Sequence, residues 1–467
     1  MANEKKAADQ LKEKLFFKNP NCYEKMSEAD VKKAYDYCEG YKSFLDSGKT
    51  EREFVKAAVE MLTNKGFKEF EFGTKVKAGD KFYYNNHNKS LAAFVIGKET
   101  LDKGLNISAA HIDSPRVDFK QHPVYEADGM CFFKTHYYGG IKKYQWTTIP
   151  LAIHGVVTKA NGETVTIKLG DEENDPVFYI NDLLIHLSGD QMRKSLADGI
   201  TGEQLNVLVG SRPYPDVQAD GIKLNVMNYL YEKYGITEAD LMSAELCAVP
   251  ASKARDIGFD RSLIGAYGHD DKVCAYPSLT ALVENSKAPV HTCMAILADK
   301  EEIGSEGNTG MQCEVFFDII SDIAKTQKVN DAVVRRNAKC LSADVNACFD
   351  PNFPETCERK NSCFMNKGVV ITKFTGSRGK SGSNDASAEF MGYVRNLLDE
   401  NKVVWQTSEL GKVDQGGGGT VAKFIAKKNV ETIDLGVPVI SMHAPIEVVG
   451  KTDVYMTHKA LAAFFKA

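Results

Sequence analysis

Residues 105–115 have the sequence Leu-Asn-Ile-Ser-Ala-Ala-His-Ile-Asp-Ser-Pro, in which a short apolar run leads directly into His111 and Asp113. The run predicts a strand that ends at two polar side chains. Further strand-like runs alternate with helical patterns in the C-terminal half of the chain. The strand-like runs are 290–297, 339–344, 368–374 and 430–436, and the helical ones are 310–327 and 384–401. This alternation predicts an α/β sandwich with a largely parallel central sheet.

The N-terminal part of the chain combines helical and strand-like patterns. Residues 29–45 place apolar side chains at three- and four-residue spacing, which predicts a helix. Thr50 followed by Glu53 has the pattern of a capping box before a second helix. Short apolar runs at 81–84 and 91–96 predict strands.

Residues 124–250 have a different pattern, in which short β-like runs alternate with turn-rich pieces. The β-like runs are 144–149, 151–157 and 164–169, and a helix is predicted near 222–234. We interpret this segment as an inserted, mainly β domain, so that residues 1–123 and 251–467 form one discontinuous domain. The acidic run 171–175 within the insertion predicts a solvated hairpin tip rather than a metal site.

The composition is that of an ordinary soluble globular protein, and a chain of 467 residues is long enough for two domains. A net charge of −5 gives no electrostatic reason to expect nucleic acid or a membrane as partner. No stretch approaches the roughly 18 apolar residues of a membrane span, and the charged start lacks the apolar core of a secretory signal. The 11 cysteines include no C-x-x-C pair, which is typical of reduced thiols and favours a cytoplasmic protein.

Imidazole and carboxylate side chains follow the ends of several predicted strands. In parallel α/β sheets, functional side chains gather beyond the carboxyl ends of the strands, so we expect these groups to lie together. His and carboxylate ligands without thiolates are the donors that a hydrolytic metal site requires. Each cluster alone is a weak signal, but their combination in a regular α/β chain predicts a metal centre. The clusters are His111 with Asp113, Asp270 with Asp271, Glu301 with Glu302, Asp344 and His443.

The segments that contain these residues resemble those of the aspartyl aminopeptidase and vacuolar aminopeptidase I family of dinuclear zinc aminopeptidases. The resemblance covers nearly the whole chain. It implies a three-layer sandwich of the zinc-peptidase type with an inserted β-rich dimerisation domain. The matching segments are His-Ile-Asp-Ser-Pro (111–115), Asp-Asp (270–271), Glu-Glu-Ile-Gly-Ser (301–305), Ser-Ala-Asp (342–344), Asp-Gln-Gly-Gly-Gly-Gly-Thr (414–420) and Ser-Met-His (441–443).

The resemblance implies a set of ligands for two divalent metal ions. Asp270 would bridge both ions, Glu302 and His443 would complete one site, and His111 with Asp344 would complete the other. Three carboxylates against four positive charges leave one positive charge, which suits a hydroxide that attacks the scissile carbonyl. These ligand types accommodate Zn, and also Co or Mn.

The resemblance also implies roles for residues beside the ligands. Glu301 would be the general base and then the acid, and Asp113 would orient the imidazole of His111. Many family members have Asn where this chain has Asp271, so both aspartates are candidates for the bridge, and the alignment with the family favours Asp270. His269 and Asp271 would then lie behind the ligands.

The substrates implied by the family are short peptides, which would lose an N-terminal residue, including an acidic one. The basic loop 376–381 is interpreted as part of the substrate pocket, with Arg378 or Lys380 pairing with an acidic side chain; the alternative is a solvated turn. Gly418 and Gly419 would let the backbone approach the peptide. His186 would either reach the active site of a neighbouring subunit or be an ordinary β-edge histidine.

Assembly is also expected from the resemblance, because the family forms dimers that build a tetrahedral homododecamer. Two other functions remain compatible with the residues. A carboxypeptidase or amide deacylase of the same clan would use similar ligands, and a self-assembling scaffold with a vestigial site would need no reaction. The complete ligand set together with Glu301 argues against the scaffold.

Overall fold

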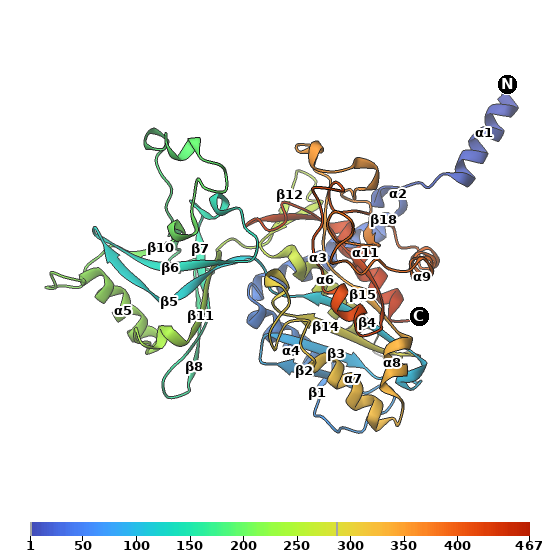
Figure 1. Ribbon diagram of the computed structural model, residues 1–467, viewed down its shortest axis with the longest axis horizontal. Helices are drawn as coiled ribbons and strands as arrows, with labels where there is room; N and C mark the ends of the chain where they lie inside the picture. The colour runs from blue at the N-terminus through green and yellow to red at the C-terminus, as the bar shows by residue number, and fades with distance from the viewer. Residues whose placement is uncertain (1, 286–287) are drawn as a thin grey trace.

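The computed structural model describes residues 2–285 and 288–467, which form an α/β fold with two large β-sheets (Figure 1). A nine-stranded sheet lies in the larger part of the molecule. A seven-stranded sheet projects to one side of it together with helix α5 (Gly221–Tyr234). Helix α1 (Ala2–Leu15) extends away from both sheets. Within the described residues, no helix is long and apolar enough to cross a membrane.

The nine-stranded sheet has a parallel centre, in which β14, β4, β15 and β19 run side by side in one direction. Antiparallel pairs lie on both sides of this centre. Strands buried on both faces are expected to be rich in apolar residues, and β14, with the sequence Thr-Cys-Met-Ala-Ile-Leu-Ala, fits this most fully. In spatial order the strands are β1 (Lys68–Glu69), β2 (Lys81–Asn86), β3 (Ser90–Val95), β14 (Thr292–Ala298), β4 (Leu105–His111), β15 (Ala338–Ser342), β19 (Glu431–Gly436), β17 (Val369–Thr372) and β18 (Trp405–Thr407).

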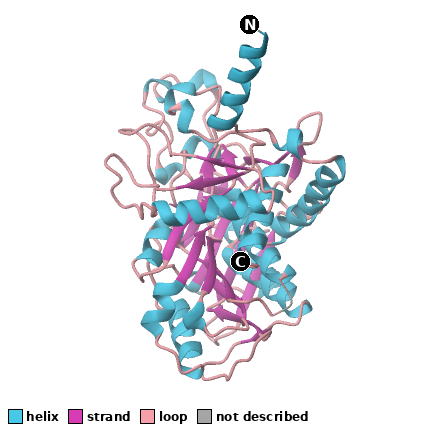
Figure 2. Cartoon of the chain, turned by 90° about the vertical axis from the view of Figure 1, so that its right-hand side faces the viewer, coloured by secondary structure: helices cyan, strands magenta, loops and turns pink. Residues whose placement is uncertain are grey.

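Side chains of this sheet alternate between two hydrophobic cores, because successive residues of a strand point to opposite faces. In β14, Cys293 and Ala295 belong to one core, and Met294 and Ile296 belong to the other. Helices flank the central strands (Figure 2). The first core contains residues of α2 (Cys22–Lys25), α3 (Glu28–Ser47), α4 (Glu51–Asn64), α6 (His269–Glu284), α9 (Ala388–Glu400) and α11 (Lys451–Phe464); the second contains residues of α7 (Val315–Thr326), α8 (Asp331–Asn337) and α10 (Ala422–Ala426).

The seven-stranded sheet is built from one continuous segment of the chain, from β5 to β11. The predicted boundary at residue 124 falls inside β5, because this strand already begins at Arg116. In spatial order the strands are β8 (Thr164–Leu169), β7 (Leu151–Thr158), β11 (Ala244–Pro250), β5 (Arg116–Ala127), β6 (Met130–Tyr138), β10 (Val207–Gly210) and β9 (Tyr179–Ile180). A smaller sheet contains β12 (Arg255–Ile257), β13 (Leu263–Ala266), β21 (Glu447–Gly450), β20 (Pro438–Ile440) and β16 (Asn346–Ala347).

The strand predicted at 144–149 is wrong. Residues Lys143–Trp146 form a short 3-10 helix, and the next strand begins only at Leu151. The indole of Trp146 is fully buried and meets the ring of Tyr267 edge-on, with 6.3 Å between ring centroids. A single aromatic side chain therefore fills the core here without the run forming a strand, which periodicity alone does not distinguish.

The helices predicted in the C-terminal half are present, but they begin later in the sequence than predicted. The helices predicted at 310–327 and 384–401 begin at Val315 and Ala388. The second start is set by Ser387, whose side chain accepts a hydrogen bond from the backbone N of Phe390. The predicted capping box of Thr50 and Glu53 is confirmed, with both of its reciprocal hydrogen bonds present.

Asp171 differs from the expected solvated hairpin tip. Its side chain is only 5% exposed, and one oxygen lies 2.7 Å from Nζ of Lys49, which is itself 4% exposed. The other oxygen lies 3.2 Å from Nε2 of the buried His154. Residues 172–174 are exposed as expected. The first acid of the run is therefore part of a buried ion pair that connects the loop before α4 to the end of β8.

We predict that Asp171→Ala lowers the free energy of unfolding by about 3 kcal/mol, because it leaves the buried ammonium group of Lys49 without its counterion. Denaturant unfolding measures the change, and Glu172→Ala in the exposed tip is the matched control. Equal stability of the two variants would show that the buried pair contributes nothing.

Candidate metal centre

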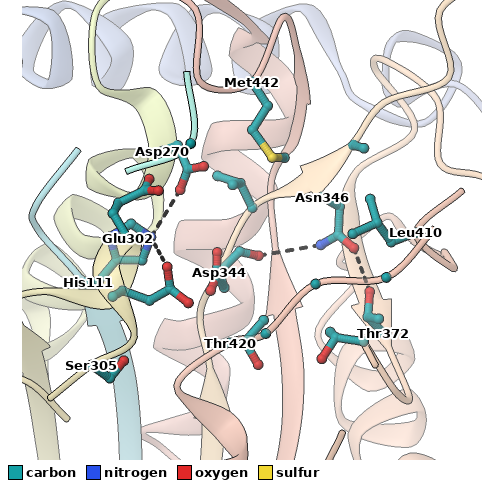
Figure 3. Close-up of a pocket in the computed structure, with 18 of the residues that line it drawn as sticks. His111, Asp270, Glu302, Ser305, Asp344, Asn346, Thr372, Leu410, Thr420 and Met442 are labelled. Atoms are coloured by element: carbon teal, nitrogen blue, oxygen red, sulfur yellow. Dashed lines mark hydrogen bonds and ion pairs between the residues drawn. The ribbon is translucent and has the colours of Figure 1, made fainter. Parts of the chain in front are cut away.

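The predicted strand ends meet at one edge of the nine-stranded sheet. In the parallel register, Ala298 of β14 lies opposite His111 of β4, and Ser342 of β15 lies opposite Ala109. Glu301 and Glu302 follow β14 in a short 3-10 helix, and Asp344 lies just beyond β15. Parallel strands that end at the same level bring the side chains after them together. Figure 3 shows His111, Asp270, Glu302 and Asp344 pointing toward a common space.

Asp270 lies between two imidazoles. Its Oδ1 is 3.0 Å from Nε2 of His111, and its Oδ2 is 3.2 Å from Nε2 of His443. Two sets of ligand atoms share this carboxylate, each with atoms within 4.8 Å of one another. One set is His111, Asp270 and Asp344, and the other is Asp270, Glu302 and His443.

The chemistry of this donor set fits divalent cations. Oε1 of Glu302 is buried and has no hydrogen-bond partner among the described residues, although a buried carboxylate oxygen is normally paired. His111 and Asp270 are also buried, with exposures of 1% and 3%. Nitrogen and carboxylate oxygen donors of this kind suit zinc and similar ions.

The electrostatics of the centre also favour a cation. Burial and the neighbouring charge of Asp270 raise the pKa of Glu302 well above its usual range. Burial and the charge of Asp271 do the same for the pKa of Asp344. Burial raises the pKa of Glu301 to about 7. Crowded buried carboxylates resist ionisation, and a divalent ion between them would reverse that preference.

Asp113 holds several parts of the centre at once. Its Oδ1 is 3.2 Å from Nδ1 of His111 and accepts a hydrogen bond from the backbone N of Glu301 at 3.1 Å. Its Oδ2 accepts hydrogen bonds from the backbone N of Glu302 at 3.2 Å and from the hydroxyl of Tyr138 at 2.8 Å. The carboxylate expected behind His111 therefore also fixes the loop that carries the two glutamates.

Glu447 is a supporting residue that sequence reasoning missed. Its buried carboxylate accepts hydrogen bonds from the backbone N of His443 at 2.7 Å and of Asp270 at 3.0 Å. The turn before it places Ser441 and His443 at φ values of 60° and 65°. The sequence does not predict such a turn, so the spacing between His443 and Glu447 does not indicate this role.

The two neighbours of Asp270 point elsewhere. Asp271 accepts a hydrogen bond from the backbone N of His111 at 3.3 Å, and the peptide bond between Asp270 and Asp271 is cis. The Nδ1 of His269 is 2.7 Å from the hydroxyl of Tyr41. Both side chains are fully buried, and neither belongs to a ligand set among the described residues.

A cavity of about 520 Å³ opens in front of the centre. Gly418 and Gly419 line it, as do Lys423 and Phe424 at the start of α10. Gly417 positions this wall: it has a φ of 108°, and a Cβ there would lie 2.4 Å from the Cα of Ser377. Only glycine fits such a contact, so the glycine run is a packed wall rather than a flexible linker.

The other residues predicted for the substrate pocket lie outside this lining. Arg378 and Lys380 are exposed, and Nζ of Lys380 is 3.2 Å from Asp385. His186 lies in an exposed short 3-10 helix (Ile185–Leu187) of the segment that carries the seven-stranded sheet. Their contact with substrate stays a prediction. Lys423, which sequence reasoning missed, gave no signal beyond its position after the glycine run.

The fold and the donor set are those of an α/β metallohydrolase. Residues 44–465 match the family described as aminopeptidase I zinc metalloprotease (M18), and the chain belongs to this M18 family of zinc aminopeptidases. A relative named probable M18 family aminopeptidase 1, from Clostridium acetobutylicum, is 47% identical over 453 residues, which cover 95% of this chain and 97% of the relative.

Solved structures agree with this membership. The crystal structure of an M18 aminopeptidase from Thermotoga maritima has a TM-score of 0.92 at 40% identity, covering 97% of this chain and 100% of that chain. The S. cerevisiae mApe1 dodecamer shares the fold, with a TM-score of 0.76 at 22% identity over 92% of this chain and 96% of that one. The chain is therefore a metallo-aminopeptidase.

Proposed function

We propose that this aminopeptidase works with two divalent ions per subunit, zinc being the first candidate. Asp270 is the shared ligand, His111 and Asp344 complete one site, and Glu302 and His443 complete the other. The observation that carries this proposal is the position of Asp270, whose two oxygens each face the Nε2 atom of a different histidine. Asp271 supports the proposal indirectly, since one of its oxygens accepts the backbone N–H of His111 and it belongs to none of the ligand sets among the described residues.

Divalent ions at such a centre supply Lewis acidity, which polarises the scissile carbonyl and makes water a better nucleophile near neutral pH. Glu301 lines the cavity, with Oε2 3.9 Å from Nε2 of His111. We assign to Glu301 the transfer of a proton from the attacking water to the leaving amine. Asp113 holds the backbone of Glu301 and so keeps this carboxylate at the cavity.

We predict that Glu301→Gln lowers kcat on an aminoacyl amide by at least about 100-fold while the zinc content stays unchanged, because only the proton acceptor is lost. Steady-state kinetics and elemental analysis of the same preparation measure both quantities. Glu306→Gln, at an exposed position of the same loop, is the control. Unchanged turnover would refute the assignment of Glu301.

Asp270 and Asp271 are adjacent but are expected to respond differently to the same change. Asp270→Asn removes the charge shared by both ligand sets, so we predict loss of zinc and of activity. Asp271→Asn keeps an oxygen that can accept the hydrogen bond from His111 N, so zinc binding should persist. Zinc titration monitored by calorimetry checks both variants, and the reverse pattern would make Asp271 the shared ligand.

We also propose that the cavity accepts acidic N-terminal residues through Lys423 rather than through Arg378 or Lys380. Of the described residues that line the cavity, Lys423 alone carries an ammonium group. Its Nζ lies 4.8 Å from the ring centroid of Phe424. Lys423 is a partly buried residue of the cavity lining, and an ammonium group in such a position is suited to pair with a substrate carboxylate.

We predict that Lys423→Met lowers kcat/KM for an aspartyl amide about tenfold or more, with a much smaller effect on a leucyl amide, because one charge-assisted contact is lost. Lys380→Met is the matched control outside the cavity lining. Equal losses on both substrates, or the same selectivity change in the control, would contradict this role.

The catalytic unit is proposed to be a three-layer sandwich, which the two cores on opposite faces of the nine-stranded sheet support. The inserted domain would begin with β5 and end with β11.

We propose that this domain mediates dimers within a dodecamer, like the one described for mApe1. An exposed apolar stretch around His186 supports an interface there; it comprises Leu183, Leu184, Ile185, Leu187, Met192 and Leu196. A cytoplasmic location is supported by eleven free cysteines.

A further inference from the structure

The end of strand β6 lies beside the proposed metal centre, although β6 belongs to the seven-stranded sheet. The hydroxyl of Tyr138, the last residue of β6, donates a hydrogen bond to Oδ2 of Asp113 at 2.8 Å. Two residues further along, the carbonyl of Gly140 lies 2.7 Å from Nδ1 of His443. One short stretch, residues 138–140, therefore contacts the carboxylate that supports His111 and the imidazole of His443 itself.

These contacts determine which imidazole nitrogen faces the shared carboxylate. A carbonyl oxygen can only accept, so the contact with Gly140 requires a proton on Nδ1 of His443. Nδ1 of His111 likewise faces only acceptors of Asp113, the side chain at 3.2 Å and the backbone carbonyl at 3.0 Å. Both histidines thus direct Nε2 toward Asp270, which is the tautomer that can ligate an ion.

Tyr138 acts through a carboxylate that serves more than one group. Asp113 also accepts the backbone N–H groups of Glu301 and Glu302, so its position affects the proposed proton carrier and a ligand together. The Tyr138 hydroxyl is the only side-chain hydroxyl that donates to Asp113 among the described residues. Removing it would leave the backbone N–H of Glu302 as the remaining donor to Oδ2 of Asp113 among the described residues, so the carboxylate would be held less firmly.

The stretch is itself firmly held. The guanidinium of Arg116 lies 4.1 Å from the ring centroid of Tyr138, and Arg116 forms ion pairs of 2.8 Å with Glu51 and with Asp118. Gly139 has a φ of 74°, and a Cβ there would lie 3.3 Å from both Cβ and Oε2 of Glu302. The backbone of this turn therefore packs directly against a proposed ligand.

We propose that residues 138–140 form a positioning clamp for the metal centre. The hydroxyl of Tyr138 and the carbonyl of Gly140 fix the orientation of His111, through Asp113, and of His443 directly. The segment that carries the seven-stranded sheet thus completes the catalytic site of its own subunit, in addition to any part in assembly. This inference rests on the proposed ligand roles of the two histidines.

Tyr138→Phe tests the clamp, because it removes only the hydroxyl and keeps the ring under Arg116. Tyr137→Phe is the matched control, since the neighbouring tyrosine is 41% exposed. Four quantities are measured on the full-length protein: zinc affinity by competition with a chelator, the visible spectrum of the cobalt-loaded protein, and kcat and KM for an aminoacyl amide. We expect a 10- to 100-fold loss in zinc affinity or kcat, a changed cobalt spectrum and a nearly unchanged KM.

The possible outcomes separate the clamp from the function on which it rests. The clamp alone would be overturned if the wild-type protein binds zinc and Tyr138→Phe has the same zinc affinity, cobalt spectrum and kcat as Tyr137→Phe. Absence of zinc binding in the wild-type protein would overturn the proposed ligand roles and the clamp with them. A lowered thermal midpoint without any change in the cobalt spectrum would make Tyr138 a packing residue and would also overturn the clamp.

Discussion

The carboxylate of Asp270 lies between two imidazoles, and the arrangement of the surrounding residues follows from this constraint. Its oxygens are 3.0 Å from His111 and 3.2 Å from His443, and the Asp270 side chain itself is almost fully buried. A buried carboxylate is stable only when its neighbours are fixed and its oxygens are satisfied. Hydrogen bonds from the backbone hold this position: Glu447 accepts the amide protons of both Asp270 and His443.

Three separate parts of the chain must stay in register for this geometry to exist. The parallel strands β4 and β14 bring His111 and the loop of Glu301 to the same edge. The small sheet brings His443, because β20 ends just before the turn that carries it. The seven-stranded sheet contributes the turn after β6, which contacts His443 through the carbonyl of Gly140. A close-packed interior makes such contacts mutually dependent, so a shift of one part would move the side chains of the proposed ligands.

Much of the metal centre could be predicted from the sequence, because histidines and carboxylates that follow strand-like runs are a local signal. The strand that leads into His111 and the capping box at Thr50 are local patterns of the same kind, and both are present. What could not be predicted depends on contacts between distant segments. The supporting role of Glu447 needs a turn with left-handed residues, and the burial of Asp171 needs Lys49 from far along the chain. The strand predicted at 144–149 is wrong because a buried aromatic residue can fill a core from a 3-10 helix as well as from a strand.

The most direct test of the dinuclear centre is a crystal structure of the zinc-loaded protein, with anomalous diffraction data collected on both sides of the zinc absorption edge. We predict two zinc peaks per subunit, with Asp270 in contact with both, one peak against His111 and Asp344, and the other against Glu302 and His443. A single peak, or two peaks that share Asp271 instead of Asp270, would contradict this prediction.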